Sequence, residues 1–227
     1  MTVNNTKKSE TQVIALVSIY FIIFAALWSV RELVLRGILV AAVGEFGHEL
    51  IGEALKLVIW TCPAVYLILK YKNDMLVELK TILSFKVNII KYLPVFLVFA
   101  AYNIIGAYIL NGKIGISSDF NAVTLISSVL FVGVTEEAVF RGFLLNITYK
   151  KMKPWLAVSI NALMFLVIHF PIWIHNGIFL STIMSGSFLL IIALSVTFSL
   201  VFIKSKNILI PIALHMFWNL LVTLLFS

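Results

Sequence analysis

Ionisable and amide side chains interrupt three otherwise apolar segments in the second half of the chain. The segments read TEEAVFRG, from residue 135, FLVIH, from residue 165, and HMFWN, from residue 215. Their polar candidates are Glu136, Glu137, Arg141, His169, His215 and Asn219. An ionisable side chain surrounded by lipid is costly unless it is paired or faces a wet cavity. We therefore treat these residues as candidates for chemistry.

The spacing inside these segments predicts which side chains pair. Glu137 and Arg141 are four residues apart, so on a helix they share one face and can form an ion pair. Glu136 is turned about 100° away from Glu137 and has no partner in its own helix. His215 and Asn219 are also four apart and project from one face. Glu136 is thus predicted to be free for chemistry, and Glu137 with Arg141 to be structural.

A free carboxylate and two histidines can activate water in two ways. Glu136 can take a proton from a water held against His169, while His215 and Asn219 donate hydrogen bonds to the oxyanion of a tetrahedral intermediate. Alternatively, Glu136, His169 and His215 could ligate Zn²⁺, which lowers the pKa of bound water. Both routes hydrolyse an amide, and the sequence leaves both open. The H-E-x-x-H pair of many zinc proteases is absent.

The composition predicts which elements must position these side chains. Hydrophobic residues make up 62% of the 227 residues and charged residues 12%, against about 45–50% and 25% in soluble domains. The mean hydropathy is +1.08. Polar residues could not cover a water-soluble core of this composition, so we expect an all-α, polytopic bundle of transmembrane helices in a lipid bilayer. No alternating pattern suggests a membrane β-barrel.

The chain is long enough for about seven spans of about 20 residues each. We expect a tail at 1–12, N-terminal transmembrane helices within 13–122 and a four-helix catalytic core at 123–227. The seven helices are predicted at residues 13–30, 50–69, 89–110, 123–149, 155–170, 178–203 and 208–226. At a rise of about 1.5 Å per residue, Glu136 and His169 lie roughly 21–22 Å, and His215 roughly 14 Å, from the inner ends of their helices. We expect them to meet in one layer of the bilayer.

The positive charges predict the orientation of the bundle. With the N-terminus inside, 12 of the 17 Lys and Arg residues fall in inside segments, and the outside segments carry Arg31, Arg36, Lys56 and Lys113. Basic inside loops are typical of multi-pass membrane proteins. We therefore predict a cell-membrane protein with its N-terminus inside and its C-terminus outside. The loops account for the net charge of +7, so no nucleic-acid partner is expected.

Residues 44–56 are amphipathic and could instead lie along the membrane interface. His48 stands there among Glu45, Glu49 and Glu53. Such a cluster could bind a cation. We predict instead that these side chains lie on a helix face exposed to water at the membrane interface.

Taken together, the three motifs resemble the CPBP family of CAAX prenyl proteases and bacteriocin-processing enzymes, also called Abi proteins. The resemblance covers residues 123–227 and does not extend to the first three helices. It implies an intramembrane protease of metallo- or glutamate type. Glu136 would be its water-activating base, with Glu137 and Arg141 in support and His169 at the water or metal. His215 and Asn219 would form the oxyanion site, and Phe165 would pack beside it.

We therefore expect an intramembrane endopeptidase, with or without Zn²⁺. The resemblance implies a prenylated C-terminal peptide, or a bacteriocin, leader or membrane peptide, as substrate. One alternative is a non-catalytic protein of the same fold that acts in bacteriocin self-immunity or as a scaffold, since a fold does not guarantee chemistry. Another is a proton-coupled carrier, because buried carboxylates and histidines also mark ion pathways. The sequence carries no signal for an oligomeric state.

Overall fold

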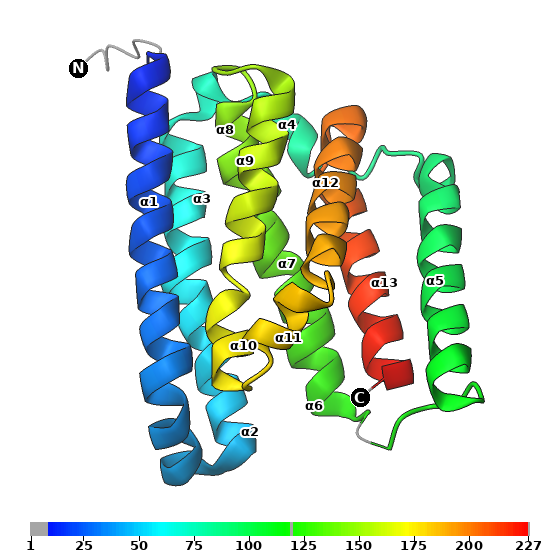
Figure 1. Cartoon of the computed structure of the whole chain (residues 1–227). Coiled ribbons are helices and arrows are strands. Elements are labelled where there is room, and N and C mark those ends of the chain that lie inside the picture. Colours follow the sequence, from blue (N-terminus) through cyan, green and yellow to red (C-terminus); the bar gives the residue numbers. More distant parts are fainter. Residues whose placement is uncertain (1–8, 119, 227) are drawn as a thin grey trace.

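The computed structural model describes residues 9–118 and 120–226, apart from the side chain of Glu45. In this part of the chain every regular element is a helix (Figure 1). Seven helices are long and apolar enough to cross a membrane: Glu10–Gly44, Phe46–Lys70, Ile89–Asn111, Ala122–Thr148, Pro154–His175, Phe188–Ser205 and Leu209–Phe226. The chain therefore has the expected all-α architecture of a multi-pass membrane protein. Residues 1–8 of the predicted tail lie outside the described residues.

The first two spans form a long helical hairpin. The first consists of α1 (Glu10–Val30), a π-helical turn η1 (Arg31–Leu35) and the start of α2 (Arg36–Lys56). The hairpin turns within α2 at Gly44, where φ is +72°, a conformation that glycine adopts without steric cost. The rest of α2 continues through η2 (Leu57–Thr61) into α3 (Cys62–Lys70). Residues 46–56 are thus continuous with the candidate span Phe46–Lys70.

The fourth span lies in the centre of the bundle and carries both glutamates of the first motif. It runs through α6 (Ala122–Thr124), η5 (Leu125–Phe131), α7 (Val132–Glu137), η6 (Ala138–Leu145) and α8 (Asn146–Thr148). Its large side chains Phe140 and Phe143 are fully buried. They pack in one apolar cluster with Phe24 of α1 and Trp60 of η2. The first two spans therefore cover one side of the site.

The helix of the fifth span is interrupted at His169. It consists of α9 (Pro154–Val167) and α10 (Phe170–His175). Pro171 lies in the first turn of α10, where its missing N–H is tolerated, whereas a helix running through this point would lose a hydrogen bond. His169 is the residue that caps α10, so it projects from a break in the helix.

The sixth predicted helix, 178–203, is wrong as a single element. The structure divides it into α11 (Phe179–Met184) and α12 (Phe188–Ser205). The division falls at Gly186, which has a φ of +75° and takes a turn conformation that other residues resist. The membrane-spanning part is α12 alone.

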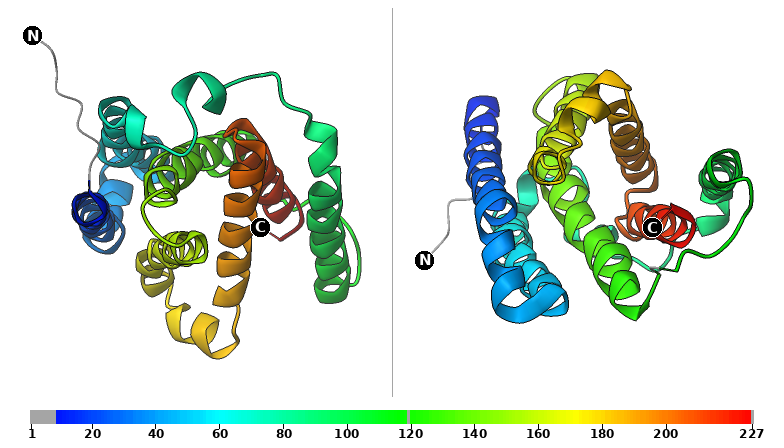
Figure 2. Two further views of the ribbon diagram at one scale, coloured as in Figure 1. Left: turned by 90° about the horizontal axis from the view of Figure 1, so that it is seen from above. Right: turned by 60° about the horizontal axis from the view of Figure 1, so that its bottom comes forward.

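The remaining elements complete the two ends and one edge of the bundle. The short helices η3 (Lys72–Asp74), α4 (Leu79–Ile82) and η4 (Ile89–Tyr92) lead to α5 (Leu93–Asn111), and the last helix is α13 (Leu209–Phe226). Seen from above, α5 lies at the edge of the bundle beyond α13 and far from α1 (Figure 2). The start of α1 and the end of α13 lie at opposite ends of the molecule (Figure 1).

Candidate active site

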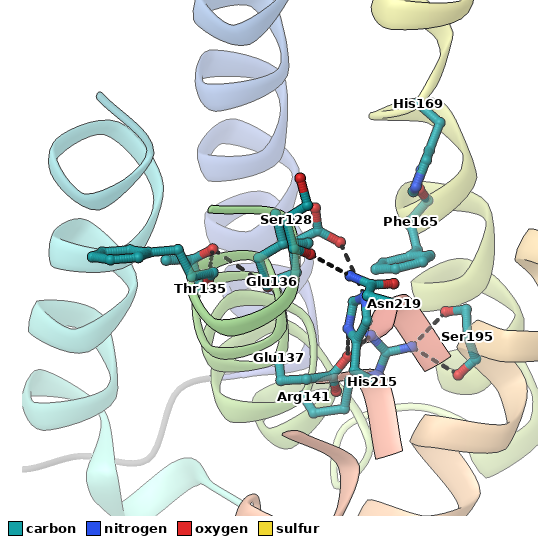
Figure 3. A network of polar contacts seen from close by, with 12 residues as sticks. Ser128, Thr135, Glu136, Glu137, Arg141, Phe165, His169, Ser195, His215 and Asn219 are labelled. Atoms are coloured by element: carbon teal, nitrogen blue, oxygen red, sulfur yellow. Dashed lines mark hydrogen bonds and ion pairs between the residues drawn. The ribbon is translucent and has the colours of Figure 1, made fainter. Parts of the chain in front are cut away.

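Glu137 lies in a fully buried polar network that joins three helices (Figure 3). Its Oε1 accepts hydrogen bonds from Arg141 Nη1 at 3.0 Å and from His215 Nδ1 at 2.9 Å. Arg141 Nη2 donates to the hydroxyl and the carbonyl oxygen of Ser195 in α12, each at 2.8 Å. The side chains of Glu137 and Arg141 are both 0% exposed. The ion pair predicted from the sequence is present, and it also fixes α12 and α13 to the fourth span.

Glu136 faces a different direction from its neighbour, as the helical rotation predicts. Its carboxylate Oε2 lies 3.9 Å from Nε2 of His215. Because Nδ1 of His215 donates to the Glu137 carboxylate, Nε2 is the ring nitrogen left for Glu136. The ring of Phe198 stacks on the imidazole, with centroids 5.0 Å apart. His215 is therefore held on two sides while its second nitrogen points to Glu136.

His169 is oriented by the last turn of its own helix. Its Nδ1 lies 2.7 Å from the carbonyl oxygen of Phe165. A carbonyl oxygen can only accept, so Nδ1 carries the hydrogen and Nε2 of the neutral ring is an acceptor. The ring of Phe165 lies 5.1 Å from the imidazole centroid, and the guanidinium of Arg141 lies over its face at 4.8 Å. Phe165 thus packs beside the site, in the place that the sequence motif suggested.

Asn219 is used to join helices. Its Nδ2 donates to the carbonyl oxygen of Ser128 in η5 at 2.9 Å, which leaves one amide hydrogen and the amide oxygen. Figure 3 shows Asn219 and His215 approaching Glu136 from α13. The site therefore brings the six predicted residues together from the fourth, fifth and seventh spans.

A cavity of about 260 Å³ opens beside Glu136 and His169. Neither His215 nor Asn219 is among the residues that line it. Its remaining charged lining comes from the first two spans: Arg31, Glu32, Arg36, His48, Glu49, Glu53 and Lys56. Arg31 and Lys56, which the sequence analysis assigned to outside segments, lie within helices and are 6% and 8% exposed. The predicted solvated face is wrong for His48, which is 2% exposed.

The charges contributed by the first two spans compensate one another in pairs. Lys56 Nζ lies 3.2 Å from Glu53 Oε1, and Glu32 contacts both Arg31 and Arg36. The ring of Trp28 lies beneath two of these cations, 5.1 Å from the Arg31 guanidinium and 5.2 Å from Lys56 Nζ. Paired charges remove much of the cost of placing ions at membrane depth, so this wall can be polar without destabilising the bundle.

The helices that carry the candidate site also match a known protein family. Residues 118–221 match the family model described as Type II CAAX prenyl endopeptidase Rce1-like. This part of the chain is thus similar to the CAAX prenyl endopeptidases that the model describes. The match contains all six candidate residues of the sequence motifs. Comparisons with curated proteins and with solved structures found no match.

The matched residues do not include the first three spans. The wall of charged side chains that faces Glu136 is therefore built from residues outside the match. A sequence signal for this wall existed, namely the ionisable residues near the start of the second span. Lys56 pairs with Glu53 three residues earlier, whereas the ring it contacts, Trp28, lies 28 residues earlier on the first span, a contact that spacing along one helix does not predict.

The donor atoms at this candidate site are of the kind that binds Zn²⁺. They are the carboxylate of Glu136 and one Nε2 each from His169 and His215. Each imidazole donates its other N–H to a carbonyl or a carboxylate, as metal-binding histidines commonly do. Within residues 9–118 and 120–226, however, no three His, Cys, Asp or Glu side chains form a group that could hold a metal ion in the arrangement shown.

Proposed function

We propose that the protein is an intramembrane endopeptidase in which Glu136 activates the attacking water. The family match supports a protease in general. The observation that supports this particular mechanism is that Glu136 and His169 line one cavity, with Nε2 of His169 left as an acceptor. A water between them can donate one hydrogen bond to His169 and lose its other proton to Glu136.

The proposed chemistry balances with these groups. The water oxygen bonds to the carbonyl carbon of the substrate while its proton passes to Glu136, which gives a tetrahedral oxyanion. The C–N bond then breaks, and the leaving amine takes the proton from Glu136. We propose His215 and Asn219 as hydrogen-bond donors to the oxyanion. His215 must then carry a proton on both nitrogens, and the carbonyl oxygen must lie on the α13 side of Glu136.

A Zn²⁺ ion held by Glu136, His169 and His215 is the alternative form of the same proposal. When bound, it would lower the pKa of the attacking water. The residues would then bind and orient, with Glu137 and the carbonyl of Phe165 fixing the two imidazoles. The substrate in either form is a peptide that reaches the bilayer, either a prenylated C-terminal peptide or an unmodified leader or membrane peptide.

Cleavage of quenched peptides by the purified protein in nanodiscs tests this proposal. Glu136→Gln should lower kcat by a factor of about 10²–10⁴, the usual contribution of a general base. Glu78→Gln is the matched control, because Glu78 is exposed in the segment between the second and third spans and should leave kcat unchanged. Equal rates for Glu136→Gln and wild type would show the mechanism to be wrong.

Each reaction is run with prenylated and unmodified peptides, and with and without a chelator. Loss of activity with the chelator, restored by added Zn²⁺, would support the metal-bound form. Unchanged activity would support the glutamate form. Protection against a bacteriocin that persists in Glu136→Gln would instead support the immunity function.

A further inference from the structure

A second cavity of about 290 Å³ lies between the second and fourth spans, next to the first. Its lining is apolar except for Glu49, Glu53 and Ser127. Both glutamates also line the cavity that contains Glu136. Leu50 and Ile126, on opposite walls, are 53% and 48% exposed, so the groove is open toward the lipid. The polar cavity and the apolar groove are therefore neighbours, with these two glutamates between them.

We propose that this apolar groove is the specificity pocket for one bulky apolar side chain of the substrate peptide. The proposal rests on the proposed function, because it assigns the groove to the same substrate. An apolar cavity of about 150 Å³ can hold a benzene molecule. The groove therefore has room for a side chain of the size of Phe or Leu. Because the groove shares Glu49 and Glu53 with the cavity that contains Glu136, the side chain it holds would belong to a residue close to the scissile bond.

The junction between the two cavities favours a peptide over a membrane lipid. Two carboxylates, Glu49 and Glu53, stand where the occupant of the groove would become polar. They repel the phosphate of a lipid headgroup, whereas they can accept hydrogen bonds from the backbone N–H groups of a peptide. Glu53 Oε1 is held by Lys56, and Oε2 is buried and accepts no hydrogen bond from any described residue. A substrate N–H would supply that missing donor.

Filling the groove tests the proposal. Ala54 lines it and is exposed, and Ala26 is an exposed alanine on α1 that does not line it. The two peptides of each pair differ only at one position, which is Ala in one and Phe in the other. Four such pairs vary, in turn, each of the two residues before and the two residues after the scissile bond. At one position, wild type should prefer Phe, and Ala54→Phe should reduce that preference about 10-fold or more, the range for an apolar subsite. Ala26→Phe should retain it.

Ile126→Ala enlarges the same groove and should shift the preference toward Trp, which keeps the proposal testable if Ala54→Phe does not fold. Equal losses for the Ala and Phe peptides, or a preference that neither variant changes, would overturn the proposal. So would an effect of Ala54→Phe that is confined to prenylated peptides and independent of the neighbouring residue.

A binding measurement separates this proposal from the catalytic one. A peptide with a photoreactive benzophenone side chain at the selective position is cross-linked to the inactive Glu136→Gln protein. Labelling should fall on residues 46–57 or 122–131, and Ala54→Phe should abolish it. Labelling elsewhere overturns the groove proposal. Cross-linking to the groove without any cleavage by wild type would contradict the proposed function and leave the groove as a binding site.

Discussion

Two adjacent glutamates have different environments because the helix turns by about 100° between them. Glu137 is fully buried and contacts Arg141 and His215 through one oxygen. Glu136 is 7% exposed and lines the cavity. The contrast between a compensated and an uncompensated carboxylate is what makes Glu136 the candidate base, and it gives Glu137 the role of orienting His215.

Arg141→Met is expected to lower the free energy of unfolding by about 3–5 kcal/mol, because it leaves the buried carboxylate of Glu137 without its cation. Thermal unfolding of the purified protein measures this, with the exposed Lys72→Met as the control. The double variant Glu137→Gln/Arg141→Met removes both charges and should be more stable than Arg141→Met alone. A double variant that is less stable than the single one would contradict the role of the ion pair.

The helix α7, which carries Glu137, packs closely against α13, which carries His215. A Cβ atom at Gly133 would lie 2.6 Å from Met216 Cγ and 3.4 Å from the Met216 backbone nitrogen. Met216 directly follows His215, so the distance between these helices also sets the position of the imidazole. The glycine is therefore required by a close approach between helices.

Gly133→Ala should destabilise the protein by about 1–3 kcal/mol through overpacking, and it should reduce cleavage by moving His215 away from Glu137. Gly37→Ala is the matched control, because a Cβ there meets no atom within 4 Å. Since alanine favours helices more than glycine does, Gly37→Ala should leave stability equal or slightly higher. Unfolding midpoints and kcat, measured together, test this. Equal behaviour of the two variants would show that the close approach is unimportant.

The odd number of candidate spans predicts that the start of α1 and the end of α13 lie on opposite sides of a membrane. The basic inside segments predict which side is which, with the C-terminus outside. Lys80 and Lys113 are both exposed and lie in segments before and after the third span. These two positions therefore report opposite sides of the membrane.

With Cys62 replaced by Ser, Lys113→Cys should react with a membrane-impermeant maleimide in intact cells. Lys80→Cys should react only after permeabilisation, because the predicted orientation places it inside. Labelling of each variant before and after permeabilisation measures this, and the two positions act as controls for each other. The reverse pattern would show that the predicted orientation is wrong.

The sequence by itself determined the membrane class and the number of spans, which follow from composition and from 20-residue apolar runs. It also singled out the six candidate residues, because ionisable and amide side chains inside such runs are costly and because their pattern resembles a known family. Only the tertiary structure showed that Arg31, Glu53 and Lys56 face the site, that His169 sits at a helix break and that an apolar groove adjoins the cavity. The physical reason is that periodicity along one helix fixes which residues share a face, whereas the partner of that face depends on how separate helices pack.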